Sequence, residues 1–114
     1  MNQDGIYSDT FSIGTSKWQL RVYPKGLGYL GKGFLSLFIS SIDSESVHAK
    51  ISMAVVSQTT LGLEVRKEME HLFPDHINNS VGSFEFIKLD ELDEATNGYI
   101  QDDSINIAVE ITCD

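Results

Sequence analysis

A strict two-residue alternation near the C-terminal end constrains the fold of this chain more than any other feature. In "SINIAVEIT", one face of an extended chain carries Ile105, Ile107, Val109 and Ile111. The other face carries Asn106, Ala108, Glu110 and Thr112. Because successive side chains of a strand point to opposite faces, this segment predicts an antiparallel strand with one buried face and one solvated face.

Similar segments recur along the chain, with short turns between them. In "HAKISMAVVS" one face carries Ile51, Met53 and Val55, and further strands are predicted at Asp9–Ile13, Trp18–Tyr23, Phe34–Ile42 and Ser83–Leu89. Glycine, asparagine, aspartate and serine separate these segments, so the spacing predicts an all-β fold, an antiparallel β-sandwich or a barrel. The alternation also predicts five core aromatic residues: Phe11, Trp18, Phe84, Phe86 and Tyr99.

Two segments depart from the strand pattern. Residues 90–97 contain helix formers and acids, and Gly98 stands where a C-cap belongs, so one short helical turn is predicted there. For "EVRKEMEHLF", Glu64–Phe73, helix propensity and alternation disagree. Alternate positions from Glu64 to Glu70 are uniformly charged, which favours a strand with one solvated face. Propensity and pattern alone leave both alternatives open.

The glycine-rich segment Gly26–Lys32 matches the letters of two nucleotide-binding motifs. "GLGYLG" fits G-x-G-x-x-G, and "GLGYLGK" fits the start of a phosphate-binding loop. Both motifs need a helix after the loop, because the helix N-terminus binds the phosphate. Gly33 stands where such a loop needs Ser or Thr, and the following "FLSLFISSI" predicts a strand. The segment is therefore predicted to connect two strands, and no cofactor is expected.

Charge and cysteine content narrow the range of partners. The chain has 114 residues, enough for a single domain over residues 1–114, and a formal net charge of −9. A negative chain is not expected to bind nucleic acid or anionic membranes, because both carry negative charge and attract Lys and Arg.

The sequence also bears on the location of the protein. Nothing approaches the roughly 20 consecutive apolar residues of a membrane-spanning helix, and no secretory signal is expected. The lone Cys113 fits a reducing compartment, so a cytoplasmic or nuclear location is expected.

Candidate metal ligands occur close together in one part of the sequence. His71 and His76 lie near Glu68, Glu70 and Asp75. Their spacing differs from the helical H-E-x-x-H pair, and two histidines rarely complete a zinc site. These residues are expected to be solvated, with no metal bound.

No arrangement of residues predicts an enzyme. Asp102 and Asp103 would point to opposite faces of a strand, so they are predicted to form a turn instead of a catalytic pair. There is no G-x-S-x-G segment, and Cys113 lies near the end of the sequence, where water is hard to exclude. No catalytic residue is therefore expected.

The order of these segments resembles the MATH domain, also called the meprin and TRAF homology or TRAF-C domain. The resemblance covers nearly the whole chain through "DTFSIGTSKWQLRVYPKG", "GKGFLSLFIS", "VHAKISMAVVSQ", "GSFEFIKLDEL" and "NGYIQDDSINIAVEI". The residues in register with the family pattern are Trp18, Tyr23, Pro24, Gly26, Leu35, Ser36, Leu37, Phe86, Leu92, Gly98, Tyr99 and Asp103. The resemblance implies an eight-stranded antiparallel β-sandwich.

The resemblance also implies a non-catalytic protein–protein interaction module. Relatives act as substrate readers in ubiquitin ligase adaptors that carry a BTB domain, as recognition domains of ubiquitin-specific proteases, and as receptor-binding parts of signalling adaptors. In the first two groups a short extended peptide pairs with an exposed strand edge, where backbone bonds supply affinity and side-chain pockets supply selectivity. Carried over from the BTB adaptors, the peptide-binding residues are Phe38, Ile51, His71, Val81, Gly82 and Ser83.

This predicted groove departs from the family pattern at several positions. Phe38 matches an aromatic residue of the family, but Ile51 and His71 replace aromatic residues. "SVGSF", Ser80–Phe84, replaces an aspartate-tryptophan-glycine-phenylalanine segment, so two bulky anchors are gone. The serine-rich peptides of the BTB adaptors are therefore not expected as ligands. The alternative is a structural or oligomerisation module with a lapsed groove.

The resemblance also predicts an open sheet edge. Family members carry one more strand upstream of the segment that matches Phe11, where this sequence has only ten residues. We therefore expect either seven or eight strands. A missing edge strand leaves N–H and C=O groups of its neighbour unpaired, which predicts a homodimer or a strand-swapped oligomer through that edge.

Overall fold

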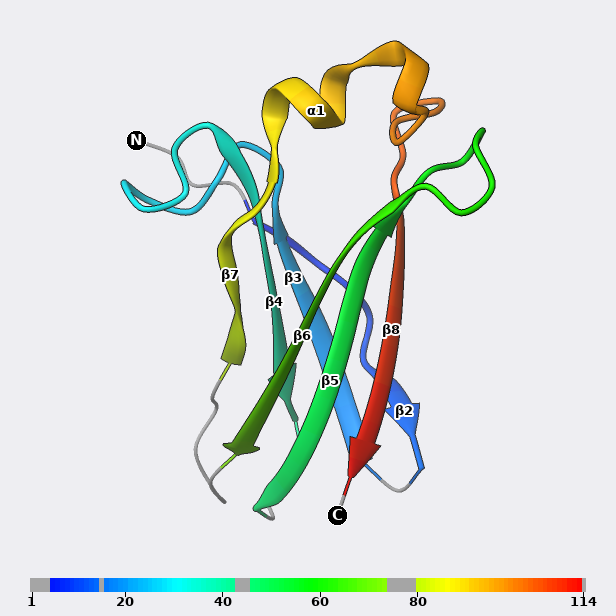
Figure 1. Ribbon diagram of the computed structural model, residues 1–114. Coiled ribbons are helices and arrows are strands. Elements are labelled where there is room, and N and C mark those ends of the chain that lie inside the picture. The colour runs from blue at the N-terminus through cyan, green and yellow to red at the C-terminus, as the bar shows by residue number, and fades with distance from the viewer. Residues whose placement is uncertain (1–4, 15, 43–45, 74–79, 114) are drawn as a thin grey trace.

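The structure is an antiparallel β-sandwich, seen in a computed structural model that describes residues 5–14, 16–42, 46–73 and 80–113. Its strands are β1 (Ile6–Tyr7), β2 (Phe11–Ile13), β3 (Ser16–Tyr23), β4 (Phe34–Ser41), β5 (Val47–Val56), β6 (Glu64–Phe73), β7 (Ser80–Lys88) and β8 (Asn106–Cys113). A short helix α1 (Leu89–Asp93) and a 3-10 turn (Ala95–Asn97) lie between β7 and β8. The strands form two facing sheets (Figure 1), which confirms the predicted fold class.

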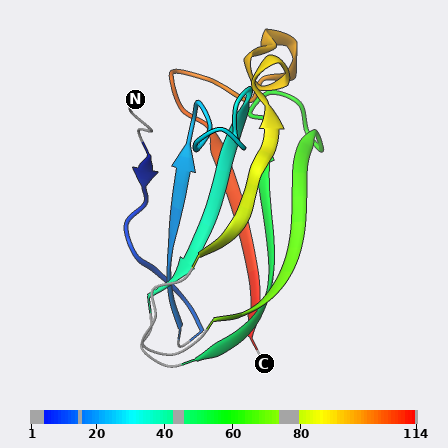
Figure 2. The ribbon, with the colours of Figure 1, turned by 90° about the vertical axis from the view of Figure 1, so that its left-hand side faces the viewer.

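The two sheets differ in width. In the wider sheet β4 pairs with β3 on one side and β7 on the other, while β1 and β2 both pair with the remaining side of β3. The narrower sheet has the order β6-β5-β8. Since β6 contacts β7, these two strands lie at the same side of the sandwich, and β8 lies at the opposite side (Figures 1 and 2).

The core lies where the inner faces of the two sheets meet. Trp18 of β3 is fully buried, and its ring meets the Phe73 ring of β6 edge to face, with 5.2 Å between centroids. Alternation explains why Leu37 and Ile39 of β4 and Met53 of β5 are also completely buried. Removal of these apolar side chains from water is the main force that holds the sheets together.

Local structure between the strands follows the sequence patterns closely. The segment whose assignment was open forms β6, because its inner face packs against the core through Val65 and Phe73 while charged side chains face solvent. The predicted helical turn is confirmed, and Gly98 ends it with φ +71°, a left-handed conformation that glycine adopts without steric cost. Asp102 and Asp103 form the predicted turn, with φ of +52° and +61°.

Several strand boundaries differ from the prediction, and one strand was not predicted. β2 begins at Phe11 rather than at Asp9, β3 begins at Ser16 rather than at Trp18, and β4 ends at Ser41 rather than at Ile42. β7 begins at Ser80 rather than at Ser83, because Gly82 already pairs with Phe38 of β4 in the segment that precedes Ser83. β1 was not predicted, because two residues are too few to show an alternation; it pairs with the end of β3.

The glycine-rich segment connects β3 to the antiparallel strand β4, as predicted. Within the described residues 16–42 no helix follows it, and the chain enters β4 directly at Phe34. Gly26 has φ +87°, and a Cβ there would lie 2.0 Å from the carbonyl oxygen of Gly31. Only glycine fits such a close approach, so the glycine at this position serves the bend of the chain.

Ser36 of β4 forms hydrogen bonds with the glycine-rich loop and with β7. Its buried hydroxyl accepts a hydrogen bond from the Leu27 amide at 3.0 Å and donates one to the Phe84 carbonyl at 2.7 Å. Ser40 lies on the same strand and is equally buried, but its hydroxyl has no hydrogen-bond partner in the part of the chain that the structure describes. Replacing each of the two serines with alanine therefore compares a hydrogen-bonded hydroxyl with an unbonded hydroxyl on the same strand.

Ser36→Ala is expected to lower the free energy of unfolding by about 1–3 kcal/mol, because it leaves an N–H and a C=O group unsatisfied in a partly buried place. Ser40→Ala removes a hydroxyl that forms no hydrogen bond with the described residues, and it is expected to be neutral or slightly stabilising. Urea unfolding followed by circular dichroism measures both changes. Equal losses in the two variants would contradict the hydrogen bonds assigned to Ser36.

Candidate functional site

β7 forms an open edge of the wider sheet. β4 pairs with one side of it, and no other strand within residues 5–14, 16–42, 46–73 and 80–113 pairs with its other side. Figure 2 views this side of the sandwich, where β6 of the narrower sheet lies next to β7. An edge strand presents unpaired N–H and C=O groups, to which another extended chain can add as a further strand.

A hollow of about 400 Å³ lies beside this edge, on the outer face of the wider sheet. Its lining comes from β3, β4, β7 and the glycine-rich loop: Arg21, Tyr23, Leu27, Phe38, Ser80, Val81, Gly82 and Phe84. Gly82 lies directly opposite Phe38 in the register of β4 and β7. A Cβ at Gly82 would lie 2.1 Å from the Leu37 carbonyl oxygen, so the two strands approach too closely here for any side chain on β7.

Three aromatic rings form the apolar part of the hollow. The Phe38 ring meets Phe84 edge to face at 5.1 Å and Tyr23 edge to face at 6.1 Å between centroids. Phe84 is 37% exposed, so the prediction that it lies in the core is wrong. The register between β4 and β7 shifts next to this residue, and the irregularity breaks the alternation that predicted Phe84 and Phe86 on one face.

Arg21 adds a positive charge to this aromatic surface. Its guanidinium lies over the Tyr7 ring, 5.1 Å from the ring centroid. The Arg21 Nε atom is buried, and no hydrogen-bond partner for it occurs among the described residues. Because Arg21 also lines the hollow, its positive charge suits a peptide carbonyl or carboxylate group there.

Tyr23 shares a hydrogen bond with Tyr7 at the rim of the hollow. This hydrogen bond, together with burial, raises the pKa of the Tyr23 phenol above its ordinary value. The folded state therefore holds this proton more tightly than the unfolded state does. The resulting stabilisation is fully present below about pH 10 and is lost as the pH rises through the folded-state pKa.

Tyr7→Phe is expected to weaken this alkaline pH dependence, because it removes the largest cause of the raised Tyr23 pKa. Between about pH 9 and about pH 11, the free energy of unfolding should fall less in Tyr7→Phe than in the unmodified chain. Urea unfolding at the two pH values measures the difference. An identical fall in both proteins would contradict the hydrogen bond between the two phenols.

The structure brings together three of the six residues that the family resemblance predicted for peptide binding. Phe38, Val81 and Gly82 line the hollow. Ser83 follows them on β7, is half-buried and lies opposite Leu37. Four of the six predicted residues, Phe38, Val81, Gly82 and Ser83, therefore lie beside the open edge of β7, next to the hollow.

The other two predicted residues lie between the sheets. His71 of β6 is half-buried, and its ring meets Phe73 edge to face at 4.7 Å. Its Nε2 atom is buried and has no hydrogen-bond partner among the residues that the structure describes. Ile51 of β5 is 2% exposed and belongs to the core, so its side chain offers almost no surface to a ligand. Neither residue lines the hollow.

Several residues of the hollow were missed by sequence reasoning: Arg21, Tyr23, Leu27, Ser80 and Phe84. A signal existed for two of them, because Arg21 and Tyr23 occupy alternate positions on the outer side of the predicted strand Trp18–Tyr23. A tyrosine and an arginine on the outer face of one strand are typical of interaction surfaces, although the structure buries most of the Tyr23 side chain. Leu27 and Phe84 gave no such signal, since a loop contact and a register shift brought them there.

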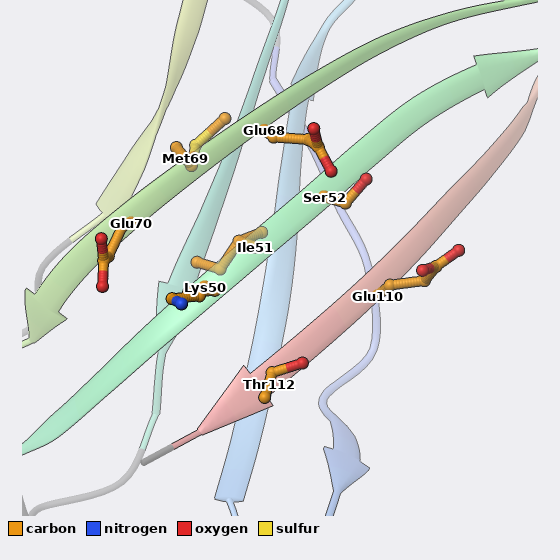
Figure 3. Close-up of a pocket in the computed structure, with 8 residues that line it drawn as sticks. All are labelled: Lys50, Ile51, Ser52, Glu68, Met69, Glu70, Glu110 and Thr112. Atoms are coloured by element: carbon orange, nitrogen blue, oxygen red, sulfur yellow. The ribbon is translucent and has the colours of Figure 1, made fainter.

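A second hollow, of about 560 Å³, lies on the outer face of the narrower sheet. Its lining, drawn in Figure 3, comes from three neighbouring strands: Lys50, Ile51, Ser52, Glu68, Met69, Glu70, Glu110 and Thr112. Arg66 beside it reaches Glu64 at 2.5 Å and Glu110 at 3.6 Å, and its hydrogen bond lowers the pKa of the Glu64 carboxyl. His48 lies 2.9 Å from Glu70. Arg66 therefore pairs with two of the carboxylates on this face.

The same face does not gather metal ligands. Across the part of the chain that the structure describes, no group of three or more His, Cys, Asp or Glu side chains is placed to hold a metal ion. β6 directs Glu68 and Glu70 outward and His71 inward, so the strand separates them. Asp75 and His76 lie outside the described residues.

The chain is similar to known proteins over nearly its whole length. A family model described as the MATH domain matches residues 1–111. Ubiquitin C-terminal hydrolase 13 of Arabidopsis thaliana is 32% identical over 117 residues, which cover 97% of this chain and 10% of that protein. Protein RESTRICTED TEV MOVEMENT 3 of the same plant is 34% identical over 116 residues, which cover 95% of this chain and 38% of that protein.

A solved structure shows the same fold. TRAF5 of Notothenia coriiceps matches with a TM-score of 0.72 and 21% identity, over 96% of this chain and 62% of that chain. The chain spans between 10% and 42% of the length of the curated relatives it matches. Among the residues that the structure describes, no helix is long and apolar enough to cross a membrane.

Proposed function

The chain belongs to the MATH domain family, and we propose that it binds a short extended peptide of a partner protein along the open edge of β7. MATH domains are protein-interaction modules without catalytic activity of their own. One observation carries the proposal: an unpaired strand edge lies directly beside a hollow with three aromatic rings. Backbone groups of β7 would supply affinity, and the hollow would supply selectivity.

A peptide bound along β7 would contact the domain on both faces of the wider sheet. A peptide that pairs with β7 directs its side chains alternately to the two faces of the extended sheet. On the outer face these side chains meet Phe38 and Gly82. On the inner side they approach Val81, Ser83 and His71, which lie along the adjoining edges of β7 and β6. Ile51 supports this side from the core rather than touching the peptide.

The chemistry of the hollow favours an apolar peptide side chain next to a carbonyl or acidic group. Tyr23, Phe38 and Phe84 supply apolar and aromatic area, which dominates the energetics of many interfaces. Arg21, which also lines the hollow, supplies a positive charge. Val81 stands where the BTB adaptors carry tryptophan, so the serine-rich peptides of those adaptors are not the proposed ligands.

The similarity to ubiquitin C-terminal hydrolases suggests the pathway in which the domain acts. Ubiquitin C-terminal hydrolase 13 matches this chain over a tenth of its own length, as a recognition domain within a larger protein would. We therefore place the domain in a ubiquitin-related pathway, as the partner-recognition part of a ligase adaptor or a deubiquitinase. The exposed free thiol of Cys113 fits a cytoplasmic or nuclear location.

Selection of peptides from a random phage-displayed library tests the proposed function. Peptides that bind the domain are expected to shift the amide NMR resonances of β7 and of Phe38 on titration. Resonances of β8, on the opposite side of the sandwich, should stay in place. Shifts confined to strands other than β7 and β4 would contradict the proposal.

The alternative function is a structural or oligomerisation module. One observation favours it: among the described residues no strand pairs with the outer side of β8, which lies at the side of the molecule opposite β7. The two functions use different strands, so a change at one edge is not expected to disturb the other.

A further inference from the structure

The inner face of β6 carries a lysine in a mostly apolar row. Burial alternates along this strand, and the more buried positions include Val65, Lys67, Met69 and Phe73. In the register with β5, Lys67 lies opposite Met53, whose side chain is completely buried in the core. Lys67 therefore belongs to the face of β6 that is directed toward the wider sheet, a place where lysine is uncommon.

This inner row of β6 lies at the same side of the sandwich as the open edge of β7 (Figure 2). Lys67 and its apolar neighbours Val65 and Met69 are half-buried, whereas the residues opposite them on β5 are buried. The wider sheet, which ends at β7 among the described residues, therefore covers the row only in part. A strand added to β7 would extend the wider sheet on this side.

The positive charge of Lys67 is not neutralised by a neighbour. Among the residues that the structure describes, Lys67 forms no ion pair. Arg66 and Glu68, which flank it in the sequence, occupy exposed positions on the opposite face of β6. Glu85, the one acid in the sequence of β7, is exposed and pairs with no described residue. A negative group of a ligand can therefore pair with Lys67.

Lys67 also helps to determine which edge receives a peptide. β6 and β7 each end their sheet at this side within the described ranges. Inward-pointing charged residues keep other strands from adding to an edge strand, so Lys67 protects β6 in this way. An extended peptide is consequently directed to β7.

We propose that Lys67 selects an acidic side chain in the peptide that pairs with β7, an inference that rests on the proposed function. Every second side chain of such a peptide points toward the narrower sheet. Facing sheets pack about 10 Å apart, a distance that a lysine and an aspartate or glutamate can span by reaching from opposite sides. The ligand class is therefore an extended peptide with Asp or Glu at an inward-facing position.

This acidic position is distinct from the hollow on the outer face. Arg21 lines that hollow, so an acid that it attracts belongs to the outward-facing side chains of the peptide. Inward-facing and outward-facing positions alternate along a strand. The acid selected by Lys67 therefore lies an odd number of residues from any acid selected by Arg21.

Phage selection with three forms of the domain tests this specificity. The unmodified domain is expected to enrich Asp or Glu at one position of the selected peptides. Lys67→Glu is expected to enrich Lys or Arg at that position instead, because the charge of its partner is reversed. Lys50→Glu is the matched control, since it makes the same change in net charge on the outer face of the narrower sheet (Figure 3). It should select acids as the unmodified domain does.

Isothermal titration calorimetry measures the strength of the pair. Replacing the selected Asp or Glu of one peptide with Asn or Gln is expected to weaken binding to the unmodified domain about fivefold. The same replacement should change binding to Lys67→Met by less than about twofold, because the positive charge is already absent. Lys67→Met keeps an apolar stem in the inner row, and circular dichroism confirms that each variant is folded.

The outcomes separate this inference from the proposed function. Peptides that shift the NMR resonances of β7 but show no acidic preference reversed by Lys67→Glu overturn the inference and leave the proposed function in place. Reversal by Lys50→Glu as well overturns it, because net charge alone is then responsible. An equal loss of affinity in the unmodified domain and in Lys67→Met also overturns it. A domain that selects no peptide at β7 overturns the proposed function and the inference together.

Discussion

Replacing Gly82 with alanine is expected to lower the free energy of unfolding by about 3 kcal/mol or more. A Cβ at this position would lie 2.1 Å from the Leu37 carbonyl oxygen and 2.7 Å from the Phe38 Cα atom. Both atoms belong to the backbone of β4, so no side chain can turn aside to make room. β7 would have to move away from β4, which disrupts the pairing that holds the proposed binding edge. Since small domains have a total stability of about 5–15 kcal/mol, the loss is a large fraction.

Gly62→Ala is the matched control for this prediction, because a Cβ at Gly62 would meet nothing within 4 Å. Its φ of +86° still disfavours alanine, so a loss of about 1–2 kcal/mol is expected. Urea unfolding of both variants measures the two losses. A Gly82→Ala loss no larger than that of Gly62→Ala would contradict the close approach of β7 to β4.

Phe38→Ala is expected to weaken the binding of a selected peptide at least about thirtyfold, corresponding to roughly 2 kcal/mol or more. Phe38 lines the hollow, and its ring contacts both Tyr23 and Phe84. Its removal takes away the apolar area that the other two rings surround. Isothermal titration calorimetry with peptides from the phage selection measures the change in dissociation constant.

Tyr29→Ala is the matched control for Phe38→Ala. Tyr29 is also aromatic, but it is 90% exposed in the glycine-rich loop and does not line the hollow. Its replacement is expected to leave peptide affinity within about twofold, because isolated exposed contacts contribute little. Unchanged affinity in a folded Phe38→Ala variant, or an equal loss in Tyr29→Ala, would move the binding surface away from the β7 edge.

Much of the fold was predictable from the sequence because the deciding information is local. The alternation of Ile107, Val109 and Ile111 reports which face of β8 is buried, whatever its neighbours are. The same is true of Gly98, whose left-handed conformation ends the helical turn. Where the alternation is interrupted, a prediction from neighbouring residues fails. Phe84 is an example, because a register shift places it on a more exposed surface than the buried Phe86.

Less of the candidate site was predictable, because it depends on which strands become neighbours. Phe38 and Gly82 are far apart in the sequence and meet only because β4 pairs with β7. Arg21 joins them because β3 lies on the other side of β4. The family resemblance supplied Phe38, Val81 and Gly82, but no periodicity in the chain indicates that β7 ends its sheet. That property is decided by the order of strands across the whole sheet.

Hydrogen exchange of the β7 backbone amides, with and without a selected peptide, tests the central claim most directly. If an extended peptide adds to this edge, amides of β7 that face away from β4 gain a hydrogen-bond partner and exchange more slowly. The amides of β8 serve as an internal reference and should keep their rates. A peptide that binds tightly while the exchange of β7 stays unchanged would contradict the proposal that this edge is the binding site.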